Sequence, residues 1–136
     1  MAGNPILDLP IGGAMVPKEE IKRAAMLRIE VMEGFAVPKN TMLQINACGL
    51  VNSKRNKGDG CTIIGSSDQN AQGEVFNDFV ISSMDVGIGK RHMVIKYSID
   101  TRNYYLRDLG DGSGTFVRLD VSLVSTLFIV NCSIRC

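Results

Sequence analysis

The chain of 136 residues carries a formal net charge of +1, and 45% of its residues are hydrophobic. This length and composition predict one globular domain with a core of its own, and they exclude a chain that is mainly disordered. A nearly neutral chain has no strong field to attract nucleic acid or an acidic membrane surface, so we expect neither as a partner.

The N-terminal segment, residues 1–26, is expected to be an arm that precedes the domain. Its first part is interrupted by Gly and Pro and shows no periodicity, which indicates a loose stretch. Pro17 followed by Glu19 and Glu20 is typical of a helix start, because proline fits the first turn and acidic side chains favour its positive end. We expect a helix of two or three turns that reaches about Met26 and is too short to be stable alone.

From residue 27 onward the sequence predicts short strands separated by turns. Leu27, Ile29 and Val31 alternate with Arg28, Glu30 and Met32, and this period of two indicates a half-buried strand. Residues 92–97 show the same alternation. About nine or ten such strands, with turn signals at roughly 8–12-residue spacing, predict an all-β sandwich or barrel. The predicted strands are 27–32, 41–47, 61–64, 78–81, 92–97, 104–109, 115–119, 127–130 and 132–135.

The cysteines and the N-terminus favour an intracellular protein. The chain has four cysteines, too few for a disulfide scaffold, and we expect them to be reduced thiols: Cys48, Cys61, Cys132 and Cys136. Of these, Cys132 and Cys136 fit the spacing of zinc ligands loosely, and on a strand they share a face with Ile134 as ordinary core residues. The N-terminus lacks a basic start followed by a long apolar stretch, and no apolar run approaches the roughly 18 residues that span a bilayer.

Three spaced segments carry a recognisable pattern. They are Thr62–Ser66 followed by Asn77–Val80, then Ile88–His92, and then Tyr105–Val117. The forkhead-associated (FHA) family pattern reads IGR, then ND, then S-R-x-H, then DLGS-x-NGT-F, and the three segments resemble it in order and spacing. The resemblance extends over roughly residues 27–136. It implies an FHA-like β-sandwich of about 11 short strands, preceded by a short N-terminal helix or arm over residues 1–26.

The resemblance also implies a site for a phosphothreonine segment in loops at one end of the sandwich. A phosphate carries nearly two negative charges and three acceptor oxygens, so it needs a cation, hydroxyl or amide donors, and backbone N–H groups in turns. Matched to the family pattern, the residues that would contact a phosphopeptide or other partner are Ser66, Gly89, Lys90, Gly112 and Ser113. The residues that would support these loops are Gly65, His92, Gly114 and Thr115.

Three of the contact residues depart from the family pattern. Ser66 stands in the place of the arginine, Gly89 in the place of the serine, and Ser113 in the place of an asparagine that holds the peptide backbone. Lys90 keeps a cation. Because charge-assisted hydrogen bonds contribute roughly 1.5–3 kcal/mol each, these replacements predict a weakened affinity for phosphate.

The other basic side chains are less well placed to replace the missing arginine. Arg91 would point away from Lys90 if both lie on a strand. The run Lys54, Arg55 and Lys57 precedes the strand that ends at Gly65, so we expect it at the opposite pole, as a solvated loop.

Catalytic interpretations find less support in the residues. No helix is predicted after Ser113, as a nucleophile elbow would require, and residues 87–92 lack the Ser or Thr and the helix of a P-loop. His92 has no paired nucleophile, so we expect it to hold loop backbone. We expect Asp108 and Asp111 to cap the turn between them. The sequence therefore predicts no catalytic residue, no metal and no cofactor.

The preferred hypothesis is an intracellular protein-interaction module of FHA type, cytoplasmic or nuclear and not an enzyme, with weakened or altered phosphothreonine recognition. Its partner would be a protein or a phosphothreonine peptide, not a small molecule. Two alternatives stay open. One is a functioning phosphothreonine reader that uses Lys90 and loop N–H groups, and the other is a regulatory or targeting domain of a larger signalling enzyme.

Overall fold

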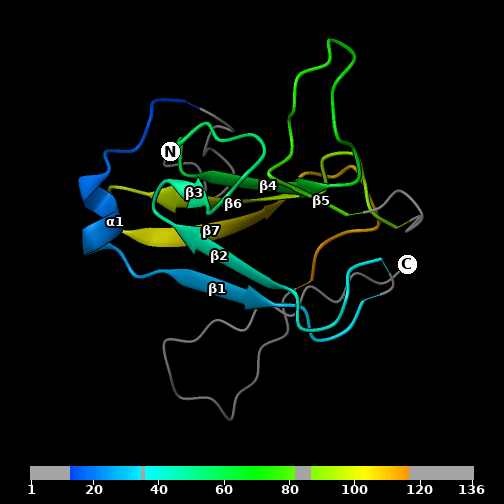
Figure 1. Cartoon of the computed structure of the whole chain (residues 1–136), viewed down its shortest axis with the longest axis horizontal. Coiled ribbons are helices and arrows are strands. Elements are labelled where there is room, and N and C mark those ends of the chain that lie inside the picture. The colour runs from blue at the N-terminus through cyan, green and yellow to red at the C-terminus, as the bar shows by residue number, and fades with distance from the viewer. Residues whose placement is uncertain (1–12, 35, 82–86, 117–136) are drawn as a thin grey trace, which may run out of the picture.

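The computed structural model describes residues 13–34, 36–81 and 87–116, which form seven strands and one short helix (Figure 1). The expected strands at 127–130 and 132–135, and most of the one at 115–119, lie outside these residues. Thr115 and Phe116 are described and are not in a strand. The elements are α1 (Glu19–Arg23), β1 (Leu27–Glu30), β2 (Met42–Asn46), β3 (Gly49–Leu50), β4 (Cys61–Gly65), β5 (Phe79–Val80), β6 (Met93–Ser98) and β7 (Asn103–Asp108).

The strands form two sheets. One sheet is antiparallel and has the order β1-β2-β3, in which β3 is too short to have given a periodic signal. The other has the order β5-β4-β6-β7, and in it β4 runs parallel to β5 and antiparallel to β6. Ile64 lies opposite Met93, and Met93 lies opposite Asp108. The end of β4, the start of β6 and the end of β7 therefore lie together, and so do the loops attached to them.

A shared apolar core joins the two sheets face to face. Ile29, Leu43 and Ile45 of the first sheet form one cluster with residues of the second sheet that include Ile64 and Ile95. Along β2 the buried Leu43 and Ile45 alternate with exposed neighbours, because successive side chains of a strand point to opposite faces. The packing confirms the all-β sandwich that the sequence predicts.

The strand β6 is buried more completely than its alternation indicates. Residues 92–97 read as a half-buried strand, yet Val94 on the outer face is 4% exposed. It packs with Ile63 and Cys61 in a second cluster outside the four-stranded sheet. Leu109, which follows β7, packs against this cluster. A covered outer face explains why β6 has no solvated side over most of its length.

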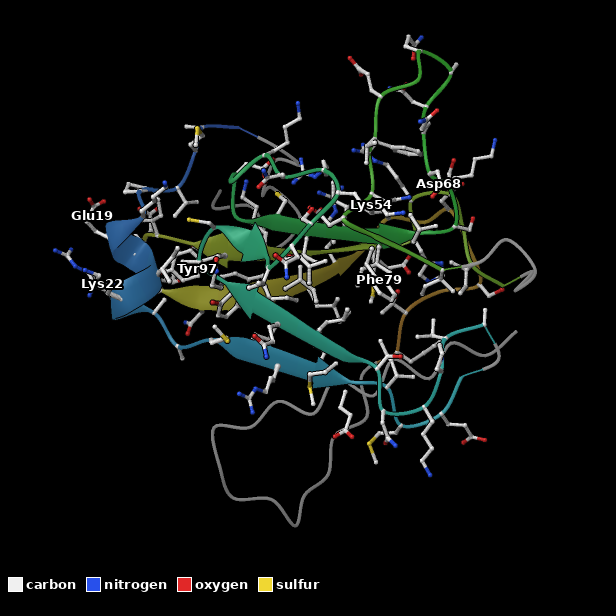
Figure 2. The ribbon with its side chains drawn as sticks, viewed as in Figure 1. Glu19, Lys22, Lys54, Asp68, Phe79 and Tyr97 are labelled. Carbon is white, nitrogen blue, oxygen red and sulfur yellow. The ribbon has the colours of Figure 1, made fainter. Side chains whose placement is uncertain are left out.

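The helix α1 is shorter than expected, and it docks on the sandwich. It ends at Arg23, because Ala24 takes an extended conformation. Glu20 is buried and accepts a hydrogen bond of 2.9 Å from the hydroxyl of Tyr97, whose side chain is labelled near α1 in Figure 2. The Tyr104 hydroxyl donates to the carbonyl of Ala25 at 2.7 Å. Burial and then Glu20 raise the pKa of Tyr97, and burial raises the pKa of Tyr104 to about 12, so both hydroxyls stay donors.

In the described part of the chain, no helix has the length and apolar character needed to span a membrane.

Candidate functional site

Three loops meet at the end of the four-stranded sheet where β4 and β7 end and β6 begins. We call this end, residues 65–67, 87–92 and 109–115, the loop pole. Backbone hydrogen bonds join its parts: the Ser66 amide donates to the Gly89 carbonyl at 3.0 Å, and the Ser113 amide donates to the Gly87 carbonyl at 2.9 Å. Gly65, the last residue of β4, lies opposite Val80 of β5. The nine residues singled out from the sequence thus come together in space, although they are spread along the chain from Gly65 to Thr115.

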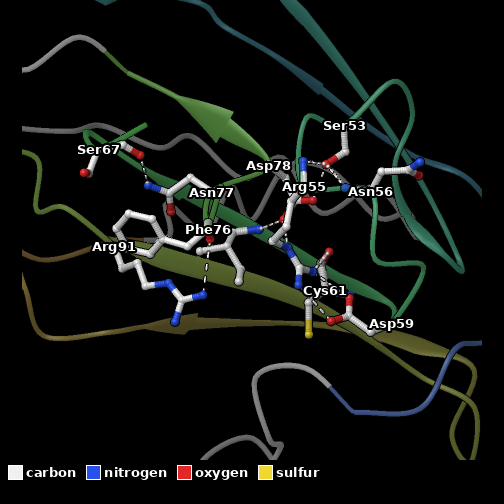
Figure 3. A network of polar contacts seen from close by, with 11 residues as sticks. Ser53, Arg55, Asn56, Asp59, Cys61, Ser67, Phe76, Asn77, Asp78 and Arg91 are labelled. Carbon is white, nitrogen blue, oxygen red and sulfur yellow. Dashed lines mark hydrogen bonds and ion pairs between the residues drawn. The ribbon is translucent and has the colours of Figure 1, made fainter. Parts of the chain in front are cut away.

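Asn77 ties two of these loops, and the sequence interpretation gave it no role. Its side chain is fully buried, and its amide nitrogen donates to the carbonyl of Ser67 (Figure 3) and to that of Lys90, both at 2.7 Å. One side chain therefore fixes the loop after β4 against the turn before β6. The signal was present, because the FHA pattern contains an Asn-Asp pair where this chain has Asn77 and Asp78.

His92 connects the other two loops from a buried position. The Gly89 amide donates to its Nδ1 at 3.1 Å, and its Nε2 lies 2.9 Å from the carbonyl oxygen of Gly114. An amide can only donate and a carbonyl can only accept, so the proton of the neutral ring sits on Nε2. The expected contact of His92 with loop backbone is present, and it reaches two loops at once.

Gly89 has no room for a side chain. A Cβ atom added there would lie 2.3 Å from the carbonyl oxygen of Asp111, far inside van der Waals contact, and the obstacle is backbone. The loop after β7 packs directly on the place where the family pattern has a serine. A hydroxyl at position 89 therefore requires that the residue 110–114 loop move away.

Three polar side chains of the loop pole are available to a ligand. Lys90 is exposed, and no described residue forms an ion pair or hydrogen bond with its ammonium group. The hydroxyl of Ser66, which is half-buried, and that of Ser113, which is exposed, likewise have no partner among the described residues. Gly112 is exposed, and it adds backbone without a side chain. The pole offers one cation, two hydroxyls and turn amides.

The family model of the FHA domain matches residues 62–125, which include nearly all of β4, the strands β5 to β7 and the loop pole. The chain contains an FHA domain. FHA domains are phosphopeptide-binding modules of protein–protein interaction. Comparison with the curated proteins and with the solved structures gave no match. The strands β1 to β3 precede the matched residues and pair in the first sheet of the same sandwich.

Asp108 and Asp111 of the FHA domain act differently, although both were expected to cap the turn between them. Asp108 does cap it, because its Oδ1 accepts from the Gly110 amide at 2.7 Å and its Oδ2 accepts from the Thr115 hydroxyl at 2.6 Å. Asp111 instead reaches another loop, where its Oδ2 accepts from the Arg91 amide at 3.1 Å. The expectation is wrong for Asp111, since the sequence gives no sign of a contact twenty residues away.

Asp108 leads to a prediction about pH. The Thr115 hydroxyl, followed by the Gly110 amide and the nearby His92, lowers its pKa against the effect of burial. A carboxyl with a lowered pKa stabilises the fold above its unfolded value of about 3.9, and this contribution is lost as the pH falls through the lower folded value. Thr115→Val should therefore move the pKa of Asp108 upward in a carbon-detected NMR titration that compares the variant with the wild type. An unchanged pKa would contradict the role of the Thr115 hydroxyl.

Arg91 is not available as a second cation. It lies in a turn before β6, not on a strand as the sequence interpretation assumed. Its guanidinium carbon lies 4.8 Å from the ring centroid of Phe76, and its Nη2 donates to the Phe76 carbonyl at 3.2 Å (Figure 3). Burial, and to a smaller extent the charge of Arg55, lower its pKa. The side chain supports the loop before β5 and leaves Lys90 as the exposed cation of the described loop pole.

The basic run Lys54, Arg55 and Lys57 is only partly a solvated loop. Lys54 and Lys57 are exposed, but the Arg55 side chain is 6% exposed and binds Asp59 and Asp78. This correction has a physical cause, because the Arg55 guanidinium is held by ion pairs with two buried carboxylates. Arg55 donates to the Cys61 carbonyl at the start of β4, so it lies away from Gly65 at the end of that strand.

A surface hollow lies elsewhere in the described part of the chain. It has a volume of about 370 Å³ and is lined by residues of β2, β3 and β5, which include Leu50 and Phe79. Its polar lining residues are Gln44, Asn52, Lys54 and Asp78, and Asp78 is already bound to Arg55. The loop pole, where the residues of the family pattern meet, is the better candidate site. Among the described residues, no group of three His, Cys, Asp or Glu side chains is placed to hold a metal. Cys132 and Cys136 lie outside the described residues.

Proposed function

We propose that the loop pole of this FHA domain docks an extended segment of a partner protein, and that its dependence on phosphothreonine is weaker than the family pattern implies. The observation that carries the proposal is the packing of Asp111 on Gly89. It leaves no space for a hydroxyl side chain at position 89. With serine also at position 66, Lys90 is the one exposed cation of the described pole. A partner is then held mainly by turn amides and by the hydroxyls of Ser66 and Ser113.

A second candidate is a working phosphothreonine reader at the same pole. The ammonium of Lys90, which has no partner among the described residues, favours it, because a phosphate attracts a free cation near backbone N–H groups. In this case Lys90 would supply the charge that the arginine of the family pattern supplies elsewhere.

We propose an intracellular location for the domain, because neither Cys48 nor Cys61 forms a disulfide within the described part of the chain.

Titration with an oriented phosphothreonine peptide library and its dephosphorylated form separates the two candidates. If the first candidate is right, the phosphorylated and dephosphorylated forms of the best peptides should bind with affinities that differ by less than about tenfold. One charge-assisted hydrogen bond to the phosphate would by itself change the affinity by roughly tenfold. Lys90→Ala tests the cation, and Lys22→Ala on α1 is the matched control, since it removes the same charge at the other end of the domain. Micromolar binding that vanishes on dephosphorylation and on Lys90→Ala would overturn the first candidate and establish the second.

A further inference from the structure

Asp111 is placed against both residues that flank Lys90. On one side its carboxylate accepts a hydrogen bond of 3.1 Å from the Arg91 amide. On the other side its carbonyl oxygen and its Cβ atom lie 2.3 Å and 2.9 Å from where a Cβ of Gly89 would be. The residue itself is exposed. A negative charge of the protein is therefore built into the turn that carries the exposed cation.

This placement opposes an anionic ligand in two ways. Backbone N–H groups of turns are the donors that such loops offer to a phosphate, and the Arg91 N–H is already bound to Asp111. A carboxylate beside the turn also repels a phosphate that carries nearly two negative charges. Among the described residues of the loop pole, Lys90 is the one exposed cation that offsets this charge. Arg91 is turned onto Phe76, and Asp108 is bonded to Thr115 and Gly110.

We propose that Asp111 is the specificity-determining residue of the loop pole and that it selects an unphosphorylated partner segment over a phosphorylated one. The carboxylate accepts the hydrogen bond of the Arg91 amide, which is then not available to a phosphate, and its negative charge repels the phosphate. This inference rests on the proposed function, because it assumes that a peptide segment docks at the loop pole. It goes further by naming the class of ligand and the residue that sets the preference.

Two substitutions separate the two effects of the carboxylate. Asp111→Asn keeps a side-chain oxygen that can accept from the Arg91 amide and removes the charge. Asp111→Ala removes both the charge and the acceptor. The matched control is Asp100→Asn, which makes the same change of charge in the turn between β6 and β7, at the other end of the sheet.

The probe is the phosphothreonine peptide library and its phosphatase-treated form, titrated against the full chain. Asp111→Asn should tighten binding of the phosphorylated form roughly three- to tenfold and leave the dephosphorylated form within about twofold, the size expected for one unit charge several ångströms from a phosphate in water. Asp111→Ala should gain at least as much. Asp100→Asn should change neither, and the gain from Asp111→Asn should shrink at 1 M salt, where the Debye length is about 3 Å.

The outcomes are distinct. If the wild type binds peptide and neither Asp111 variant changes the ratio between the two forms, the inference is overturned and the proposed function stands. If no variant binds either form, both are overturned. Amide NMR signals of Gly89 and Gly112 show whether each variant keeps the fold of the loop pole. A gain in phosphopeptide affinity in a variant with unchanged loop signals supports the inference.

Discussion

Replacing Arg55 with methionine is expected to lower the free energy of unfolding by about 3–5 kcal/mol, the cost of leaving buried charges without their partner. The guanidinium binds Asp59 through two nitrogens at 2.6 Å and 2.9 Å and binds Asp78 through Nε at 3.0 Å (Figure 3). The side chains of Asp59 and Asp78 are 4% and 3% exposed. Methionine fills the space of the aliphatic part of the arginine side chain, but it has no positive charge to compensate the charge of either carboxylate.

Urea unfolding of the full chain measures the loss. Lys54→Met is the matched control, because it makes the same change of charge at an adjacent exposed side chain, and it should stay within about 0.5 kcal/mol of the wild type. If Arg55→Met lowers the free energy of unfolding no more than Lys54→Met does, the two carboxylates are hydrated and the ion pairs contribute little to stability.

The loss of unfolding free energy caused by Arg55→Met should depend on pH. In the wild type, burial acts to raise the pKa of Asp59, but hydrogen bonds from Arg55 and from the Cys61 amide outweigh it and lower the pKa. The wild-type contribution is therefore present above the unfolded value of about 3.9 and is lost as the pH falls below it. Without Arg55, burial raises the pKa of Asp59, so protonation stabilises the folded variant. The difference in the free energy of unfolding between the variant and the wild type should become smaller as the pH falls from 7 to 4.

The sheets could be predicted from local pattern, because the side chains of a half-buried strand alternate. Leu43 and Ile45 of β2 sit where the period of two places them, on the face that meets the second sheet. The antiparallel order of β4, β6 and β7 then brings the FHA-pattern residues to one pole. The match to an FHA domain agrees with the motifs that the sequence shows.

The contacts that decide the chemistry could not be read from the sequence. Arg55 stands in a polar loop, and the carboxylate of Asp78 lies 23 residues further along the chain, so composition predicts a solvated side chain. Asp111 has the composition of a turn residue, and its bond to the Arg91 amide appears only once β6 and β7 are paired. Gly89 matched a family position, but the loop that excludes a side chain there is distant in sequence. In each case the deciding partner is long-range.

Replacing His92 with alanine is expected to lower the free energy of unfolding by about 2–4 kcal/mol, because it removes a buried ring and leaves two loop groups without partners. Those groups are the Gly89 amide and the Gly114 carbonyl, which the ring joins from opposite sides. The ring also lies against Gly112, where an added Cβ would come within 2.3 Å of Nδ1. The loop after β7 and the turn before β6 would both lose their common support.

Two smaller changes at His92 test the bonds one at a time. His92→Asn places an amide oxygen near the position of Nδ1, so it should preserve the bond from Gly89 and lose the bond to Gly114. His92→Gln reaches toward Nε2 and should do the reverse. Hydrogen exchange of the Gly89 amide, measured alongside urea unfolding, distinguishes them: protection should persist in His92→Asn and fall in His92→Gln. Equal protection in both variants would mean that the Gly89 amide is held by loop packing and not by the ring. In that case the spacing of the two loops would be set by the backbone bonds from Ser66 to Gly89 and from Ser113 to Gly87, with His92 filling the space between them.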